Sequence, residues 1–449
     1  MDRMKGLYEL NDLIQTKQYT RLRQELLAYN DADIALFLEE LEEAEMVKIF
    51  RILPKGVAAD VFSYLPIDCE QMIITSLSDS EASNIIDNLM ADDATDLLEE
   101  MPANIVKRLL ANTSPEVRRD INHLLRYPED SAGSIMTVEF LELKEHLTVE
   151  QAITRIRKVG VESETIDISY VLDHKRMLIG TVTLRQLLLS EPETTIAEIM
   201  KEHVIALYTL MDQEEVAHQF QKYDLTAMPV VDNERRLVGI ITVDDVVDIM
   251  QEEATEDMEK MAAILPSDKP YMKTGVIETF KKRIPWLLLL MVSATFTGRI
   301  IASYESALDA CTVLTAFIPM LMDSGGNAGG QASVTIIRGL SLNEIRYKDW
   351  IRIIWKESRV AFLCGLVLGI GNFCKIIWLD GLAVEVAMVI CSTLFCTITV
   401  AKLVGCTLPL CAKKLGFDPA VMASPFITTI VDAVSLSLYF TIATHVLGL

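Results

Sequence analysis

Two carboxylic acids lie inside long apolar stretches, where hydrocarbon excludes an ionised group. Asp323 opens the stretch "DSGGNAGGQ", and Asp432 lies near the middle of "PFITTIVDAVSLSLYF". Ionised side chains at membrane depth usually face a bundle interior or a water-filled path, and they mark transport routes. We therefore predict a pathway role for Asp432. Asp323 is either a second pathway acid or an acid held protonated within the bundle.

Oxygen-bearing side chains accompany both acids. Asn327 and Gln331 are four residues apart, so they share one helix face, and Thr428 and Ser435 extend a polar stripe around Asp432. Glycine pairs between Asp323 and Gln331 let neighbouring backbones approach closely. Oxygen ligands without Cys or His favour a hard cation such as Mg²⁺ or Ca²⁺. The small number of charges favours Mg²⁺, which keeps much of its water.

Five apolar stretches are long enough to cross a membrane as helices: 284–304, 310–338, 358–379, 382–411 and 420–446. Lys and Arg residues precede the first stretch and connect the second to the third and the fourth to the fifth. The alternate connections have none. Because positive residues stay in the cytoplasm, we expect a cytoplasmic N-terminal half, a C-terminus outside and a bacterial-type plasma membrane. We expect Lys402 and Arg299 to extend toward the membrane surfaces.

Charge separates the two halves of the 449-residue chain. From residue 271 onward there are 15 basic and 11 acidic residues, whereas residues 1 to 270 hold 26 basic and 53 acidic residues, a net of −27. This negative charge argues against binding of nucleic acid and against docking on anionic lipid. It fits either simple solubility or a surface that responds to cations. The eight cysteines include no Cys-x-x-Cys pair and are expected to be packing residues.

Two internal repeats organise the acidic half. A Leu or Met recurs every 12 residues from Leu41 to Met101, which predicts a helical solenoid over residues 1–130. "RMLIGTVTLRQLL" at 176–188 matches "RRLVGIITVDDVV" at 235–247, 59 residues later. Each copy predicts a strand, a turn and a helix, with another strand before it. This pattern resembles a tandem pair of CBS domains over residues 136–252, which are regulatory modules and generally not enzymes.

An acidic run joins this pair to the first apolar stretch. Seven acids between Asp244 and Asp257 occupy about four helical turns, where like charges at three- and four-residue spacing repel. A solvated acidic face is one interpretation. A connecting helix over residues 253–280 that couples the regulatory pair to the membrane part is the other, and the position of the run favours it.

The order of these parts resembles the MgtE family of magnesium channels. "GGNAGGQAS…IIRGL" and the spacing of Asp418, Pro419, Pro425 and Asp432 are similar to that family's motifs. The resemblance implies a multidomain α-helical membrane protein with an N-terminal helical solenoid, an α+β tandem CBS pair, a long connecting helix and a five-helix transmembrane domain over residues 281–449.

The resemblance also implies a site and a mechanism. MgtE channels are homodimers with a pore between the protomers, lined mainly by spans two and five. The pore acid falls on Asp432, with the backbone of Thr428 beside it, and partly hydrated Mg²⁺ binds there. Asp323, Asn327 and Gln331 would line the pore.

The family closes when acids of the cytoplasmic domains and connecting helix bind cytosolic Mg²⁺. Divalent ions would offset the mutual repulsion of these acids. By motif, the regulatory residues are Asp60, Asp92, Asp96, Asp212, Glu214, Asp224, Asp245, Asp248, Glu253, Glu256 and Asp257.

Some features depart from the family. Certain members bind adenine nucleotide in the CBS pair, but here Gln186 stands where an acid would hold the ribose. Ile168 or Leu225 replaces a stacking aromatic. Nucleotide binding is therefore in doubt, and Mg²⁺ is the expected ligand.

Three other functions compete with a magnesium channel. A transporter of Mn²⁺ or Co²⁺ would use similar oxygen ligands, and an ion-coupled secondary transporter could use Asp323 and Asp432 as its ionisable pair. A membrane enzyme is not expected, because the spans show no Ser-His or His-Glu constellation that could activate Ser324.

Overall fold

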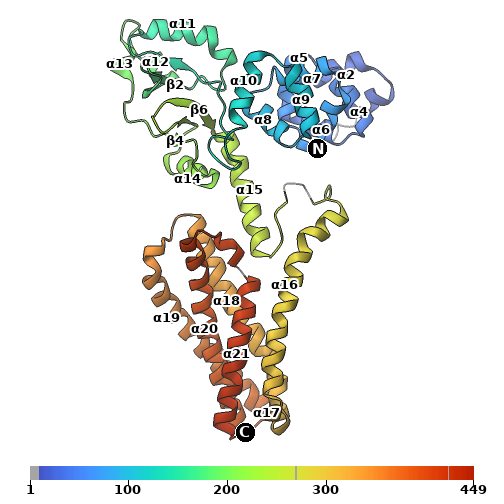
Figure 1. Cartoon of the computed structure of the whole chain (residues 1–449), viewed down its shortest axis with the longest axis vertical. Coiled ribbons are helices and arrows are strands. Elements are labelled where there is room, and N and C mark those ends of the chain that lie inside the picture. Colours follow the sequence, from blue (N-terminus) through green and yellow to red (C-terminus); the bar gives the residue numbers. More distant parts are fainter. Residues whose placement is uncertain (1–9, 268–270, 423, 449) are drawn as a thin grey trace. The chain divides into compact units, whose positions relative to one another are not determined.

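The computed structural model describes residues 10–267, 271–422 and 424–448. The chain divides into two compact units, Met1–Ile249 and Met250–Leu449, and each is described by itself. Figure 1 colours the elements in chain order from blue to red. Short helices and two small sheets form the first unit, and long helices form the second.

Short helices build the first half of unit one, and each begins 12 residues after the one before. Every predicted 12-residue repeat thus forms one helix, which confirms the repeat. The helices are α2 (Tyr19–Leu26), α3 (Asp31–Glu39), α4 (Glu43–Phe50), α5 (Lys55–Ser63), α6 (Ile67–Ser76), α7 (Asp79–Ile86), α8 (Ala91–Glu99), α9 (Ala103–Asn112) and α10 (Pro115–Leu124).

The repeated apolar residue closes each helical repeat. Leu53, Leu65 and Leu77 lie just after a helix and are buried. Helices of 8 to 10 residues are marginal on their own in water. The core that these residues share, rather than helix propensity, therefore holds the solenoid together.

Two three-stranded sheets follow, in the orders β1-β2-β3 and β4-β5-β6. In each sheet the first pair is parallel and the second is antiparallel. The second and third strands of the two sheets are 59 residues apart, as the repeat predicted. The strands are β1 (Glu142–Leu143), β2 (Ile168–Leu172), β3 (Leu178–Thr183), β4 (Leu207–Tyr208), β5 (Ala227–Val231) and β6 (Leu237–Thr242).

Helices flank the sheets at matching places. They are α11 (Val149–Val159), α12 (Leu184–Leu189), α13 (Ile196–Ile199), α14 (Gln213–Tyr223) and α15 (Val243–Met261). The two helices that follow the third strands begin alike: Thr183 caps α12 with Gln186, and Thr242 donates to Asp245 at the same step of α15. The repeat therefore extends to helix capping.

The connecting helix differs from its predicted range of 253–280. Helix α15 begins at Val243 and ends at Met261, and α16 begins at Val276. Ala263 adopts a left-handed conformation (φ 56°) directly after α15, and Pro266 follows. A left-handed residue and a proline both end a helix, so no single helix covers the predicted range. Residues 268–270 lie outside the described residues.

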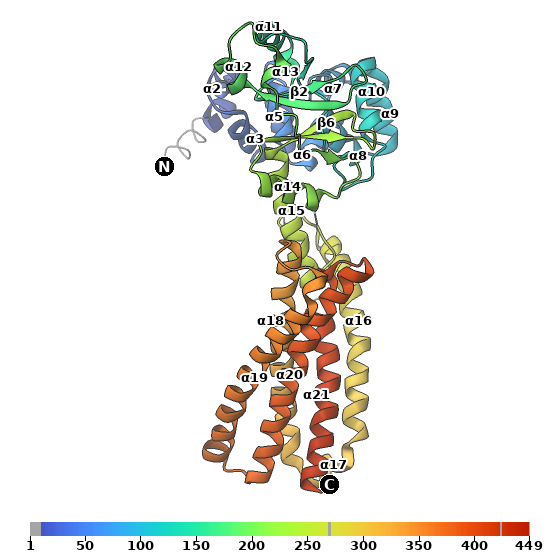
Figure 2. The same cartoon turned by 90° about the vertical axis from the view of Figure 1, so that its left-hand side faces the viewer.

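Long helices form unit two, and Figures 1 and 2 show α18, α20 and α21 side by side. The helices are α16 (Val276–Ser303), α17 (Glu305–Ala310), α18 (Ile318–Ser341), α19 (Trp350–Lys375), α20 (Val384–Leu415) and α21 (Ser424–Leu447). Among the described residues, four segments are long and apolar enough to cross a membrane: Val276–Ser303, Tyr347–Asp380, Val384–Leu415 and Pro419–Leu447.

Helix α18 corresponds to the second predicted span, but it is not one of those four. Its 24 residues are long enough to cross hydrocarbon, whereas its glycines and polar residues lower its apolar character. The count of five spans therefore stays a prediction. The predicted start at residue 310 is wrong, since a 3₁₀ segment (Thr312–Phe317) precedes the helix. Pro319 in the first turn favours a helix start there.

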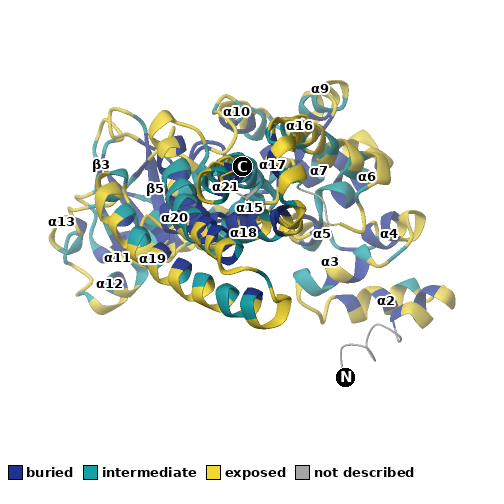
Figure 3. Cartoon of the chain, turned by 90° about the horizontal axis from the view of Figure 1, so that it is seen from below, coloured by how far each residue is buried: buried dark blue, intermediate teal, exposed yellow. Residues whose placement is uncertain are grey.

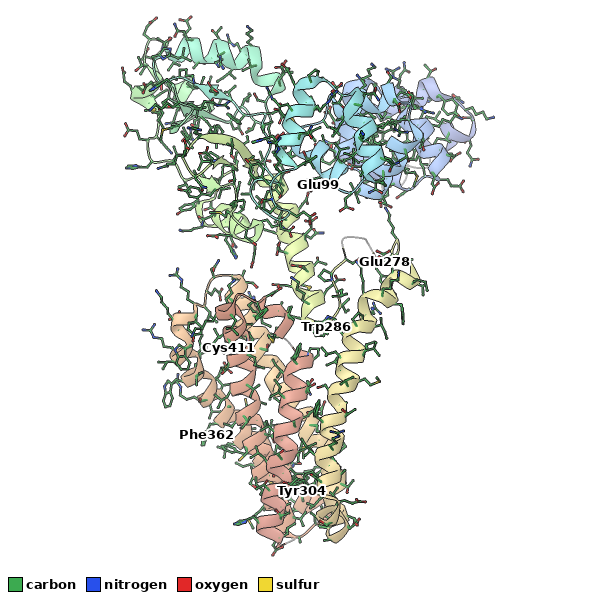
Figure 4. All side chains as sticks on the ribbon, in the orientation of Figure 1. Glu99, Glu278, Trp286, Tyr304, Phe362 and Cys411 are labelled. Carbon is green, nitrogen blue, oxygen red and sulfur yellow. The ribbon has the colours of Figure 1, made fainter. Side chains whose placement is uncertain are left out.

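The helices of unit two differ in how they are covered. Trp286 of α16 and Tyr304 just after it (both labelled in Figure 4) contact α21, where they pack on Phe426 and Phe440. Figure 3 shows long exposed faces on α19 and other outer helices. Lys402 in α20 is only 5% exposed. The expectation that it extends to a membrane surface is wrong, because close packing of α18 covers this part of α20.

Candidate cation path and acidic cluster

Helix α18 exposes a polar stripe along a single face. Asp323, Asn327, Gln331, Thr335 and Arg338 are exposed and follow one another at three- or four-residue spacing. The opposite face is buried and consists mainly of small and apolar residues, among them Leu321, Gly325, Gly329, Ala332, Ile336 and Leu340. Lipid favours an exposed apolar face, so the exposed polar face of α18 does not suit contact with lipid.

The outer helices show the usual arrangement. Leu287, Leu288 and Val292 of α16 and Phe362 and Val367 of α19 are all at least half exposed. These faces suit contact with lipid. Polar groups in hydrocarbon need partners, so the polar stripe must face water or another protein surface. This contrast supports a path along α18.

Glycines of α18 bring it close to α21. A Cβ at Gly326 would lie 2.9 Å from Thr428, and a Cβ at Gly325 would lie 2.8 Å from Val431 and 3.4 Å from the hydroxyl of Ser435. Any larger residue would separate the two helices. The glycine pairs therefore place the Asp432 region of α21 directly against α18.

The two predicted pathway acids have no partner among the residues that the structure describes. Asp323 is exposed and Asp432 is half-buried, and neither makes a hydrogen bond or ion pair with any described residue. Thr428 turns its hydroxyl back to the carbonyl of Pro425. In a regular helix its own carbonyl accepts from Asp432, which leaves one lone pair for a cation, as the backbone prediction requires.

A second group of acids gathers in unit one. Asp92 and Asp93 begin α8, Asp245 lies in the first turn of α15, and Glu139 and Glu164 come from loops of the first CBS repeat. These five residues are named the acidic cluster. Asp93, Glu139, Glu164 and Asp245 each raise the pKa of at least one other member by charge repulsion, and three of them act on Asp92. Asp92 is 9% exposed, so the repulsion acts where water screens it poorly.

Burial and repulsion together perturb the acidic cluster. Burial is the main cause that raises the pKa of Asp93 and Asp245 to about 6 and of Glu164 to about 7, and neighbouring carboxylates add to it. The pKa of Asp92 lies well above its ordinary value for the same reasons. Thr242 donates to Asp245 at 2.7 Å and partly offsets the shift there. A divalent cation would relieve this repulsion.

Glu70 of α6 is a further buried acid. It is 8% exposed, and burial, followed by repulsion from Asp93 and Asp96, raises its pKa to about 9. Its carboxyl group is therefore protonated at neutral pH. Among the described residues, no group of three or more His, Cys, Asp or Glu side chains has the spacing of a ready-made metal site.

Several predicted regulatory residues lie apart from the acidic cluster. Asp60 is exposed on α5, where burial and then Asp31 raise its pKa. Asp212 caps α14 by accepting from the backbone of Glu214, and Asp224 ends that helix in a left-handed conformation. These residues have evident roles in local structure. Asp248 lies on α15 and adds to the repulsion on Asp245.

The end of α15 makes specific contacts within unit two. Asp257 accepts a hydrogen bond from Ser341, at the end of α18, at 2.9 Å. Lys260 forms ion pairs of 2.6 Å with Glu256 and of 2.7 Å with Asp418, which precedes α21. Asp257 and Lys260 therefore hold the end of α15 against the end of α18 and the segment that precedes α21.

Three residues of the acidic cluster were not predicted from the sequence. Asp93 stands next to the predicted Asp92 and could have been found from that dipeptide. Glu139 and Glu164 lie in loops with no motif, and only the folded chain brings Glu164 near Asp245 and Glu139 near Asp93. In the CBS pair, Gln186 donates to the carbonyl of Ile199 and accepts from Thr183, so its amide is already engaged.

Comparisons with known proteins extend over all these parts. A family model described as a divalent cation transporter matches residues 318–442. The model of the MgtE intracellular N domain matches residues 29–130, and that of the CBS domain matches residues 196–252.

Relatives align over nearly their whole length. The magnesium transporter MgtE of Thermus thermophilus is 36% identical over 438 residues, 97% of both chains. That of Bacillus subtilis is 34% identical over 425 residues, 92% of this chain and 93% of the relative.

Solved structures match the first unit. The cytosolic domain of the Mg²⁺ channel MgtE in complex with ATP is 36% identical, with a TM-score of 0.52 over 54% of this chain and 99% of that chain. The soluble part of a magnesium transporter is 31% identical, with a TM-score of 0.54 over 56% and 99%.

The matched family consists of transporters, not enzymes, and the apolar helices identify a multi-pass membrane protein with a cytosolic N-terminal domain. Identity above 30% over nearly all of both chains shows that this protein belongs to the MgtE family of magnesium transporters.

Proposed function

We propose that the chain is a Mg²⁺-selective channel that mediates magnesium uptake and closes when cytosolic Mg²⁺ is sufficient. The observation that carries this proposal is the exposed polar stripe of α18 beside two carboxylates that have no partner among the described residues. A homodimer in a bacterial plasma membrane, with the C-terminus outside, would enclose this stripe between two copies of the chain.

The pore residues follow from the stripe and its neighbour. Asp432 would bind partly hydrated Mg²⁺, with the Thr428 carbonyl beside it. Asp323, Asn327 and Gln331 would line the path along α18. Carboxylate, amide and carbonyl oxygens around a largely hydrated ion suit Mg²⁺, which gives up its water reluctantly.

Closure would use the acids of the cytosolic domains. At low Mg²⁺ the acidic cluster repels itself, and Mg²⁺ bridging Asp92 and Asp245 would remove that penalty. The same helix α15 contacts the end of α18 through Asp257. Ion binding at one end of α15 would thus bias the path at the other. The remaining proposed regulatory ligands are Asp60, Asp96, Asp212, Glu214, Asp224, Asp248, Glu253 and Glu256.

The test is Mg²⁺ uptake into vesicles by the parent and by Asp432→Asn, with internal Mg²⁺ low and then high. We expect the parent to transport only at low internal Mg²⁺ and the variant to transport poorly or unselectively. Asp309→Asn, which removes an exposed carboxylate from α17, serves as the matched control. Equal transport by the parent and Asp432→Asn would make Asp432 a structural acid.

Two alternatives have direct tests. Competition between Mg²⁺, Mn²⁺ and Co²⁺ during uptake distinguishes a magnesium channel from a transporter of another divalent ion. A proton or Na⁺ gradient imposed at constant Mg²⁺ changes flux through a coupled transporter but leaves a channel unchanged.

Nucleotide binding is a separate question. A relative's cytosolic domain has been solved with ATP, whereas here Gln186 is engaged in capping α12. We propose that Mg²⁺ alone is sufficient for closure in this chain. ATP titration of the purified full chain, followed by its shift in thermal unfolding, measures whether nucleotide adds to that response.

A further inference from the structure

Asp323 is the second of the two predicted pathway acids in unit two. It lies in the first two turns of α18, and no described residue provides it with a hydrogen bond or an ion pair. An ionised or a protonated carboxyl group in hydrocarbon needs a polar partner, so its partner must come from water, a cation or a second copy of the chain.

The glycine contacts show where Asp323 lies along the helix axes relative to Asp432. A Cβ at Gly325 would lie within 3.4 Å of both Val431 and Ser435, so Asp432 lies level with Gly325. Asp323 is two residues nearer the start of α18, a rise of about 3 Å along a helix axis. The two carboxyl groups are therefore less than one helical turn apart in depth.

Both acids also adjoin the same face. Thr428 and Asp432 are four residues apart and share one side of α21. Thr428 touches Gly326, which immediately precedes Asn327 of the polar stripe. Asp323, Asn327 and Gln331 continue that stripe at four-residue spacing. An ion moving along α18 would meet Asp323 and Asp432 within one helical turn of each other in depth.

We propose that Asp323 binds hydrated Mg²⁺ at the outer end of the path and passes it to Asp432. This inference rests on the proposed function and on the proposed orientation, in which the start of α18 lies outside. Two carboxylates at nearly the same depth repel each other when the path is empty, and a divalent cation between them removes that repulsion. Asp323 then sets how much external Mg²⁺ is needed to fill the path.

The predicted effect of Asp323 is on ion capture, not on passage. A divalent ion in a water-filled path about 7 Å from one carboxylate gains a factor of about five to ten in occupancy by Coulomb's law. Asp432 remains for the passage itself. Removing Asp323 should therefore raise the half-saturating external Mg²⁺ concentration while the maximal rate stays within about twofold.

The experiment measures Mg²⁺ influx into proteoliposomes against external Mg²⁺, with internal Mg²⁺ kept low. The chains compared are the parent, Asp323→Asn, Asp323→Ser, Asp323→Glu and the control Asp309→Asn. We expect a rise of about five- to tenfold in half-saturating Mg²⁺ for the two neutral variants. Asp323→Glu and Asp309→Asn should match the parent.

Each other outcome has a defined meaning. If Asp323→Asn and Asp323→Ser saturate at the parent's Mg²⁺ concentration, Asp323 binds no ion and the inference is overturned. If both neutral variants fail to fold while Asp323→Glu folds, Asp323 is a packing acid and the inference is likewise overturned. If the parent shows no Mg²⁺ flux, or Asp432→Asn conducts like the parent, the proposed function itself fails.

Discussion

The crossing of α18 and α20 offers a sharp test of the membrane unit. A Cβ at Gly405 would overlap the carbonyl oxygen of Gly329 and lie 3.0 Å and 3.1 Å from its carbonyl carbon and Cα. All three are backbone atoms, so no side-chain rotation can relieve the clash. In Gly405→Ala, α20 must move away from α18 by about 1 Å to restore ordinary contact.

The size of the effect follows from two opposing terms. Alanine favours a helix interior over glycine by about 0.8–1 kcal/mol. Overpacking in a tight interior costs about 1–3 kcal/mol, and the upper part of that range applies because rigid backbone is displaced. We therefore expect Gly405→Ala to destabilise the membrane unit by about 1–2 kcal/mol. It should also reduce Mg²⁺ uptake, because the displaced α18 carries the polar stripe.

The matched control is Gly371→Ala in α19, where a Cβ would meet nothing within 4 Å. It makes the same chemical change in a helix interior and should be neutral or slightly stabilising. Thermal unfolding in detergent and Mg²⁺ uptake in vesicles measure both variants. If Gly405→Ala melts and transports like Gly371→Ala, the close crossing of α18 and α20 does not exist.

Three further predictions concern charged groups. The pKa of Glu70 is raised to about 9 in the folded chain. The contribution of this carboxyl group to the free energy of unfolding is therefore largest below pH 4.5 and falls as the pH rises toward 9. Glu70→Gln should therefore increase hydrogen-exchange protection of α6 by about 2–4 kcal/mol at pH 8 and hardly at all at pH 5. The pKa of Asp245 is also raised, to about 6, so its contribution to the free energy of unfolding likewise falls as the pH rises. Without Mg²⁺, Asp245→Asn should stabilise α8 by about 1–3 kcal/mol at pH 8 and not at pH 4. With saturating Mg²⁺, α8 should be more stable in the parent than in the variant. Lys260→Met should lower hydrogen-exchange protection around Asp418 by about 0.5–1 kcal/mol, whereas the control Lys375→Met, which breaks an ion pair elsewhere in unit two, should leave it unchanged.

Regular repeats made much of the fold predictable. The 12-residue period predicted one short helix and a turn per repeat, because the apolar residue that closes each repeat enters or packs against the shared core. The 59-residue period fixed two copies of a sheet, and the copies agree as far as the caps at Thr183 and Thr242. Periodic patterns survive folding because each copy solves the same local packing problem.

Boundaries and long-range contacts were less predictable. The apolar residues from 310 to 317 gave no sign that α18 would begin only at Ile318. Lys402 resembles a surface-seeking side chain in the sequence, and only the approach of α18 shows that it is buried. Glu164 comes near Asp245, and Glu139 near Asp93, through tertiary packing of separate loops, which no local pattern encodes.

Among the described residues, carboxylates are left without protein cations in both units, but for different physical reasons. In the acidic cluster they are close together and partly dehydrated, so their pKa values are raised and the ionised forms are disfavoured without a metal. In unit two, Asp323 and Asp432 have no hydrogen-bond or ion-pair partner among the described residues, and the exposed stripe next to Asp323 carries neutral Asn327, Gln331 and Thr335 before it reaches Arg338. Under the proposed function, one kind of ion would relieve both situations. Mg²⁺ that enters past Asp323 and Asp432 would raise the cytosolic concentration that fills the acidic cluster, so the transported ion would also be the signal for closure.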